Sequence, residues 1–197
     1  MTLRFEVLHG PEITARLDDL ADLRITVFRD WPYLYDGDRD YERGYLTAYR
    51  DNLGAILVAA LDGDRIVGAA TGFPMADHAS EFAAAFAVTG IDLARVFYCA
   101  ESVLLPDYRG QGAGHAFFDL REAHAAALGH DHVAFCAVQR PADHPLRPAS
   151  YRPLDAFWRK RGYRPLPGVV AEFDWKDIDQ PASTSKPLQF WMRQIAP

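Results

Sequence analysis

Residues 108–115 read YRGQGAGH and lie between two contrasting patterns. The apolar run 96–105 comes before them and predicts a buried strand, and an alanine-rich pattern of helical period follows over 112–128. Glycines let a ligand come close to the backbone, and the free N–H groups at a helix start point toward that ligand. The stretch therefore predicts a strand, a turn and a helix N-terminus that binds a phosphate.

The glycine spacing separates this loop from two common phosphate-binding motifs. A dinucleotide fingerprint needs a later third glycine and an acidic residue about 20 positions further on, and a nucleotide P-loop ends in Gly-Lys-Ser/Thr. The loop has neither feature. Residues 109–114 read RGQGAG and follow ESVLLPDY at 101–108, and this combination resembles the acyl-CoA-binding motif of the GNAT superfamily of N-acyltransferases. Residues 157–163, FWRKRGY, resemble the helix and Gly-aromatic ending of the same family.

The resemblance implies how a cofactor would be held. In that family the central strand and its parallel neighbour splay apart, and the pantetheine arm of acetyl-CoA, or of another short acyl-CoA, adds to the exposed strand edge. Carried onto this sequence, the main chain of Ser102, Val103 and Leu104 is expected to contact that arm. The pyrophosphate is expected to contact the loop residues, which are Arg109, Gly110, Gln111, Gly112, Ala113, Gly114 and His115.

Glu101 is the candidate general base. It interrupts an apolar strand that should be buried on both faces, where an unpaired carboxylate is costly. Burial is expected to raise its pKa toward neutrality, which suits a group that takes a proton from an ammonium. The GNAT resemblance agrees, because the family often places an acid five residues before the proline. The alternative is a structural ion pair with an arginine such as Arg65 or Arg95.

The general acid is less well defined by the sequence. The resemblance predicts a tyrosine at the position of Trp158, and an indole N–H can donate a hydrogen bond but does not supply a proton. Tyr151 and Tyr98 are the candidate substitutes, and packing against neighbours is the alternative for both. Protonation of the leaving thiolate by solvent also remains open.

The apolar patterns and turns predict one domain over residues 1–197, of α/β class. With the resemblance, the expected fold is a GNAT-like mixed and mostly antiparallel sheet, flanked by helices, with a splayed parallel central strand pair. Helices are predicted at 13–28, 40–50, 79–88, 112–128 and 154–161. Strands are predicted at 3–8, 55–61, 65–73, 96–105, 132–138, 169–175 and 188–195, with a proline-rich loop at 140–153.

Composition narrows the partners. The net charge of −6 opposes general nucleic-acid binding, which depends on clustered cations, and it suits a cationic acceptor such as an amine. No apolar stretch predicts a signal peptide or a membrane span, and Cys99 and Cys136 are expected to be buried thiols. The expected compartment is the cytoplasm. A homodimer through the last strands is an analogy with similar folds.

Residues 31–41 are aromatic and acidic and predict a wall around the acceptor. Trp31, Tyr33, Tyr35 and Tyr41 could enclose an amine by cation–π contact, or could simply pack. The acidic run 36–40 lacks the later glycine and glutamate of a calcium loop, and the histidines lack metal-ligand spacing, so no metal site is expected. Arg140, Arg147 and Arg152 could recognise a substrate carboxylate or a CoA phosphate, or face water.

The sequence thus favours an acyl-CoA-dependent N-acyltransferase. The expected reaction is acetyl transfer from acetyl-CoA to a primary amine of a small molecule by direct attack. Two alternatives stay open: a catalytically weak module that binds or senses acyl-CoA, motivated by Trp158, and an enzyme that acetylates proteins or peptides. Segments 33–40 and 140–153 look long enough to close over a small acceptor, which favours the first reading.

Overall fold

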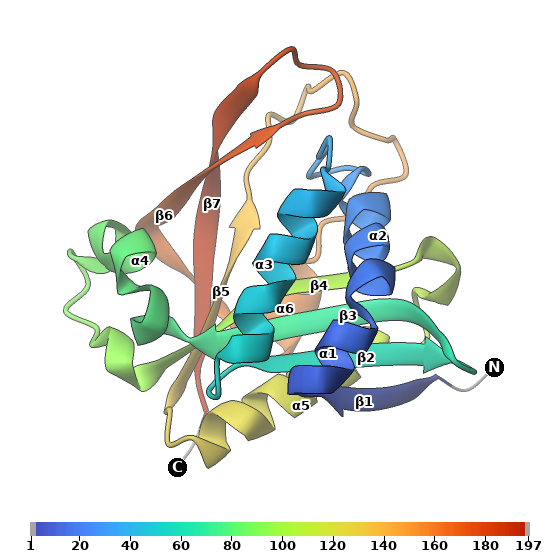
Figure 1. Ribbon diagram of the computed structural model, residues 1–197. Coiled ribbons are helices and arrows are strands. Elements are labelled where there is room, and N and C mark those ends of the chain that lie inside the picture. Colours follow the sequence, from blue (N-terminus) through green and yellow to red (C-terminus); the bar gives the residue numbers. More distant parts are fainter. Residues whose placement is uncertain (1–2, 196–197) are drawn as a thin grey trace.

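The computed structural model describes residues 3–195, in which seven strands form one sheet with helices on both faces (Figure 1). The elements in chain order are β1 (Arg4–Leu8), α1 (Gly10–Ala15), α2 (Leu17–Phe28), α3 (Arg39–Asp51), β2 (Ile56–Asp62), β3 (Arg65–Pro74), η1 (Met75–His78), α4 (Ala79–Phe86), η2 (Leu93–Arg95), β4 (Val96–Leu104), η3 (Pro106–Tyr108), α5 (Ala113–Ala127), β5 (His132–Val138), α6 (Asp155–Lys160), β6 (Arg164–Lys176) and β7 (Ser183–Gln194).

The strand order in the sheet is β1-β2-β3-β4-β5-β7-β6. Every neighbouring pair is antiparallel except β4 and β5, which are parallel. The helix α5 connects these two strands, as a parallel crossover requires. The predicted α/β class, the mixed sheet and the parallel central pair are therefore confirmed.

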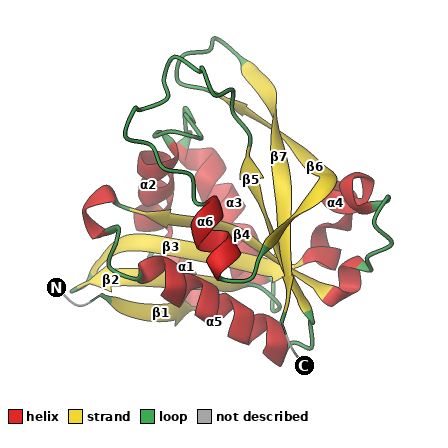
Figure 2. Ribbon diagram, turned by 180° about the vertical axis from the view of Figure 1, so that it is seen from behind, coloured by secondary structure: helices red, strands yellow, loops and turns green. Residues whose placement is uncertain are grey.

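Side chains of the central strands alternate between two apolar clusters. In β2, Leu57 and Leu61 belong to one cluster, whereas Ile56 and Val58 belong to the other. Helices α1 to α4 contribute to the first cluster, and α5 and α6 to the second. Figures 1 and 2 show these helix groups on opposite sides of the sheet. The sheet is thus the middle layer of three.

Two predicted elements differ from the observed ones. The single helix expected over 13–28 is divided at Arg16, whose backbone leaves the helical region (φ −113°, ψ 10°) and serves as the end of α1 and the start of α2. The last two strands are longer than predicted and reach 164–176 and 183–194. Their added residues include three prolines, Pro165, Pro167 and Pro187, and lack the alternation of apolar and polar side chains that predicts a strand.

A β-bulge interrupts the pairing of β3 with β4. Thr71 pairs with Glu101 and Phe73 pairs with Tyr98, so two steps along β3 face three steps along β4. The extra residue changes the alternation of β4, because Tyr98, Ala100 and Glu101 all line one cavity. The bulge therefore decides which face of the sheet receives Glu101.

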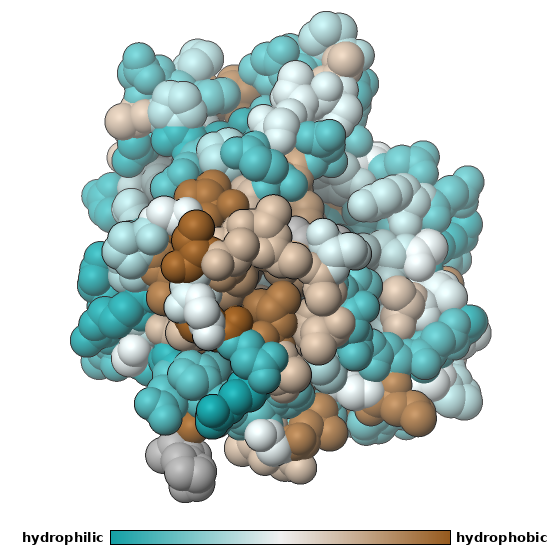
Figure 3. All heavy atoms as spheres, turned by 90° about the vertical axis from the view of Figure 1, so that its left-hand side faces the viewer, coloured by the Kyte–Doolittle hydropathy of each residue, from teal (hydrophilic) through white to brown (hydrophobic). Residues whose placement is uncertain are grey.

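The side of the molecule that carries α4 shows a group of apolar side chains bordered by polar ones (Figure 3). Val88, which follows α4, is 82% exposed. None of the described helices has both the length and the apolar character that crossing a membrane requires.

Gly72→Ala should lower the free energy of unfolding by about 1–3 kcal/mol, because the bulge leaves no room for a side chain there. A Cβ atom at Gly72 would lie 2.5 Å from Phe97 Cε1 and 2.9 Å from the Tyr98 carbonyl oxygen. The matched control is Gly44→Ala in the exposed interior of α3, where a Cβ meets nothing within 4 Å. The control should raise the free energy of unfolding by about 0.5–1 kcal/mol. Urea titration measures both, and an unchanged midpoint for Gly72→Ala contradicts the prediction.

Candidate functional site

The parallel strands β4 and β5 separate soon after they begin. They pair only from Val96 opposite His132 to Tyr98 opposite Ala134, although β4 continues to Leu104 and β5 to Val138. Beyond that point β4 is held by β3 and β5 by β7. A gap therefore opens along one edge of β4, and an extended chain could add to this edge as a strand does.

The alternation of the backbone tells which groups face this gap. The N–H of Leu105 donates to Val67 O of β3 at 2.9 Å. Residues one and three positions earlier in β4 point their backbone groups the opposite way, so Ser102 and Leu104 present N–H and C=O to the gap. Of the three residues that the sequence assigned to the cofactor arm, Val103 instead turns its backbone toward β3 and buries its side chain.

The glycine loop joins the end of β4 to the start of α5. Gly110 and Gly112 have φ of +79° and +86°, a left-handed conformation that favours glycine. Within the described chain, the amides of residues 110–114 donate to no backbone acceptor, and His115 N is the first that does, to Gly112 O at 2.9 Å. The loop therefore presents free N–H groups at the positive end of a helix, which is a suitable site for an anion.

The other loop residues have different roles. Arg109 donates from Nε to Leu104 O at 3.2 Å, which ties the loop to the edge of the gap. Gly114 packs against α6, because a Cβ there would lie 3.3 Å from the Phe157 ring. His115 stacks edge-on against the same ring and its Nδ1 lies 3.1 Å from Nη1 of Arg161. Gly114 is thus required for helix packing as much as for the loop.

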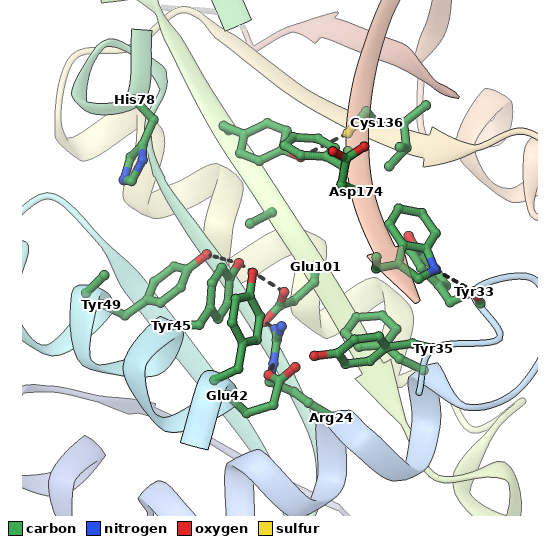
Figure 4. Close-up of a pocket in the computed structure, with 18 of the residues that line it drawn as sticks. Arg24, Tyr33, Tyr35, Glu42, Tyr45, Tyr49, His78, Glu101, Cys136 and Asp174 are labelled. Atoms are coloured by element: carbon green, nitrogen blue, oxygen red, sulfur yellow. Dashed lines mark hydrogen bonds and ion pairs between the residues drawn. The ribbon is translucent and has the colours of Figure 1, made fainter. Parts of the chain in front are cut away.

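A cavity of about 760 Å³ lies on the α2–α3 side of the sheet, beside the separated strands. Figure 4 shows side chains from α2, α3, β4, β5 and β6 directed into it. The acidic and basic side chains of its lining are five carboxylates, Asp36, Glu42, Glu101, Glu172 and Asp174, and two cations, Arg24 and Lys176. The cavity is therefore negatively charged.

Glu101 is part of a buried charge network in this cavity. Its carboxylate forms an ion pair with Arg24 of α2, and Arg24 also pairs with Glu42 of α3. The three side chains are 9%, 8% and 0% exposed. The sequence had suggested an arginine such as Arg65 or Arg95 as the ion-pair partner of Glu101, but the partner is Arg24. Arg95 pairs with Asp131.

Two tyrosines of α3 extend this network. The Tyr45 hydroxyl donates to Glu101 Oε2 at 3.1 Å and lies 2.7 Å from the Tyr49 hydroxyl (Figure 4). Since each hydroxyl has one hydrogen, Tyr49 donates to Tyr45 when Tyr45 donates to Glu101. Burial raises the pKa of both tyrosines, so both keep their protons at neutral pH. The i, i+3 and i+7 spacing of Glu42, Tyr45 and Tyr49 is the sequence signal that could have found this face of α3.

The two candidate acids occupy different surroundings. Tyr98 lines the cavity, but its hydroxyl lies 2.9 Å from Cys136 Sγ, and burial raises its pKa well above the ordinary value. Tyr151 lies outside the cavity lining and its ring is 5.9 Å from that of Trp31. Trp158, at the position where a tyrosine was expected, packs against Phe135 and Trp191.

The expected aromatic wall is present in part. Tyr33, Tyr35 and Tyr41 line the cavity, whereas Trp31 does not and packs on His144. Residues 33–36, which include Tyr33 and Tyr35, run beside the end of β6. The backbone N–H of Asp36 donates there to Lys176 O at 2.8 Å. The Lys176 ammonium also lowers the pKa of Asp36.

Arg140 holds this wall and does not face a ligand. It forms a buried bidentate pair with Asp177 at 2.6 and 3.0 Å and donates to Pro32 O and Tyr33 O at 2.8 and 2.6 Å. These bonds and those of Lys186 lower the pKa of Asp177 although burial opposes them. Arg147 stays close to its own loop, over the Tyr151 ring. Arg140 is therefore a structural residue, which corrects its possible role in recognising an anion.

Cys99 and Cys136 are free and buried, as expected. Burial raises the pKa of these thiols to about 11 and about 12. Neither thiol is therefore a nucleophile at neutral pH.

Solved structures share this fold over the whole chain. An aminoglycoside 6'-N-acetyltransferase complexed with coenzyme A superposes with a TM-score of 0.62 and 18% identity, covering 100% of this chain and 98% of that one. An aminoglycoside 6'-N-acetyltransferase from Enterococcus faecium gives 0.62 and 16% over the same shares. A ribosomal-protein-alanine N-acetyltransferase from Brucella melitensis gives 0.61 and 14%, covering 99% of this chain and 100% of that one.

A search among curated proteins gave no match. The sequence model of the Acetyltransferase (GNAT) family, in contrast, matches residues 18–152, which include the charge network, the bulge, the glycine loop and both separated strands. The chain therefore belongs to the GNAT family of acetyltransferases.

Proposed function

We propose that this enzyme transfers an acetyl group from acetyl-CoA to a primary amine of a small cationic molecule, by direct attack of the amine. The observation that carries the proposal is the position of Glu101. Its side chain lines a negatively charged cavity, and it belongs to β4, which pairs with β3 along one edge and faces the open gap along the other. The donor and the acceptor can thus approach the same strand from two directions.

The residues present fit the cofactor. The free amides of residues 110–114, at the positive end of α5, suit the pyrophosphate, and Arg109 adds a charge beside them. The backbone groups of Ser102 and the N–H of Leu104 suit the amide-containing arm, whereas the Leu104 carbonyl already accepts from Arg109. Acetyl-CoA, when bound, supplies the activated thioester.

Glu101 is the proposed general base. An amine reacts only as the neutral form, and an ionised carboxylate in the cavity can accept the ammonium proton, directly or through water. The ion pair with Arg24 and the hydrogen bond from Tyr45 fix the orientation of the Glu101 carboxylate. Of the two candidate acids, Tyr98 has the better support because it lines the cavity.

The acceptor is proposed from charge and enclosure. Five carboxylates against two cations attract an amine that is itself positively charged, and Tyr33 and Tyr35 offer ring faces to it. Structures of similar fold include aminoglycoside acetyltransferases and a ribosomal-protein-alanine acetyltransferase, so the preference for a small acceptor over a peptide is based on the charge of the cavity.

The test is incubation with acetyl-CoA and a panel of amines, with free thiol and the mass of the product as readouts. The panel contains simple monoamines, diamines, amino sugars and peptides with free N-termini. We expect turnover with the small cationic amines. Turnover with peptides alone supports protein acetylation, and CoA binding without any turnover supports a binding or sensing module; either result contradicts the proposal.

Glu101→Gln should lower kcat/KM for the best acceptor by about 10²–10⁴-fold at pH 7, because an amide cannot accept the proton. CoA affinity should stay within about twofold, since the carboxylate faces the acceptor cavity. The matched variant is Glu42→Gln, which removes a carboxylate from the same network and leaves Glu101 paired with Arg24. It should lower kcat/KM by less than about tenfold. Equal losses in the two variants show that the network matters only as a whole.

Gly112→Ala should weaken CoA binding by about tenfold, because a Cβ disfavours the left-handed backbone that aims the loop amides. Gly129→Ala is the matched control, since Gly129 has nearly the same φ, +85° against +86°, at the opposite end of α5. Both substitutions should lower the free energy of unfolding by about 1–2 kcal/mol, and a Cβ meets nothing within 4 Å at either position. Calorimetric titration with CoA separates them, and identical affinities argue against the loop as the pyrophosphate site.

A further inference from the structure

Arg121 is a fully buried cation in the middle of α5, with 1% of its surface exposed. No carboxylate whose side chain the structure describes forms an ion pair with it. Its donors instead reach oxygen atoms of the sheet and of its own helix: Nη1 donates to Thr71 O at 3.1 Å and to Glu101 O at 2.8 Å, Nη2 to Ser102 Oγ at 2.8 Å, and Nε to Phe117 O at 3.1 Å. A buried charge is costly unless such acceptors surround it.

The β4 bulge explains why these acceptors are available. Where the register shifts between Thr71 and Phe73, the ladder of β3 and β4 opens. The Nη1 atom of Arg121 bonds both carbonyls at the last regular pair, Thr71 with Glu101. Arg121 therefore fixes the bulge from the α5 face of the sheet, while Arg24 pairs with the Glu101 side chain from the other face.

The peptide between Glu101 and Ser102 connects this cation to the gap. Its carbonyl accepts from Arg121, and its N–H, on Ser102, points toward the separated strands. A charged donor on an amide carbonyl withdraws electron density and makes the N–H of the same amide a stronger donor. The hydrogen bond from Arg121 to Glu101 O therefore makes the Ser102 N–H a stronger donor toward the gap.

We propose that Arg121 is a positioning residue for acyl transfer, which clamps the Glu101–Ser102 peptide and strengthens the Ser102 N–H as a donor to the thioester carbonyl. The proposal rests on the proposed function, because it needs the acyl group in the gap. A stronger donor at that oxygen stabilises the negative charge that develops there during the reaction.

The first test uses the unmodified chain and NMR, with acetyl-CoA and S-ethyl-CoA as probes. S-ethyl-CoA has the same pantetheine arm and pyrophosphate as acetyl-CoA but lacks the thioester carbonyl oxygen. Both probes should shift the amide signals of residues 110–114, and only acetyl-CoA should move the Ser102 amide proton downfield and shift the Arg121 guanidinium signals. No loop shift with either probe contradicts the proposed function. Loop shifts with equal Ser102 responses, or with an unmoved Arg121, overturn the role of Arg121.

The second test uses Arg121→Met and Arg121→Lys. Arg121→Met should reduce the Ser102 response to acetyl-CoA and lower kcat by about tenfold, with KM for acetyl-CoA within about twofold. Arg121→Lys keeps the positive charge and should recover part of the Ser102 response and part of kcat. Arg193→Met, which removes bonds to Glu122 and Arg161 O away from the bulge, is the control and should leave the Ser102 response unchanged. A folded Arg121→Met chain with the full Ser102 response overturns the proposal, and the experiment on the unmodified chain decides it if that variant does not fold.

Discussion

The early end of the β4–β5 pairing is the constraint on which the rest of the site depends. Three paired residues hold the parallel strands together, and after them each strand keeps only its other neighbour. The gap faces the glycine loop at one end and the α2–α3 cavity at the other. If β4 and β5 stayed paired to the end of β4, the facing backbone groups of the two strands would bond to each other and leave none there for a second molecule.

Buried arginines from both faces converge where the gap begins. Arg24 arrives from α2 and Arg121 from α5, and they engage the side chain and the backbone of the same residue, Glu101. Buried ion pairs contribute little net stability, whereas loss of one partner is strongly destabilising. The arrangement therefore holds one carboxylate and one amide in fixed positions more than it stabilises the fold.

The parts of the molecule that could be predicted are those written in local sequence. Apolar runs predicted the central strands, and the glycine loop with its flanks predicted the family. Arg24 could not be predicted as the partner of Glu101, because that contact depends on how α2 crosses the sheet. Arg121 lies in a helix whose pattern looks ordinary, and the two backbone carbonyls that it bonds at the bulge depend on the register between two strands.

The Arg140–Asp177 pair has a consequence for how an acceptor would enter. It bonds the backbone at Pro32 and Tyr33 to the end of β6, so that the aromatic wall of Tyr33, Tyr35 and Tyr41 is ordered before any ligand binds. Little conformational entropy is then lost when an amine enters, and selection among amines falls to fixed shape and charge rather than to closure of a lid. An ordered wall of this kind favours rigid amines over long flexible ones, because a flexible amine loses more conformational entropy on binding.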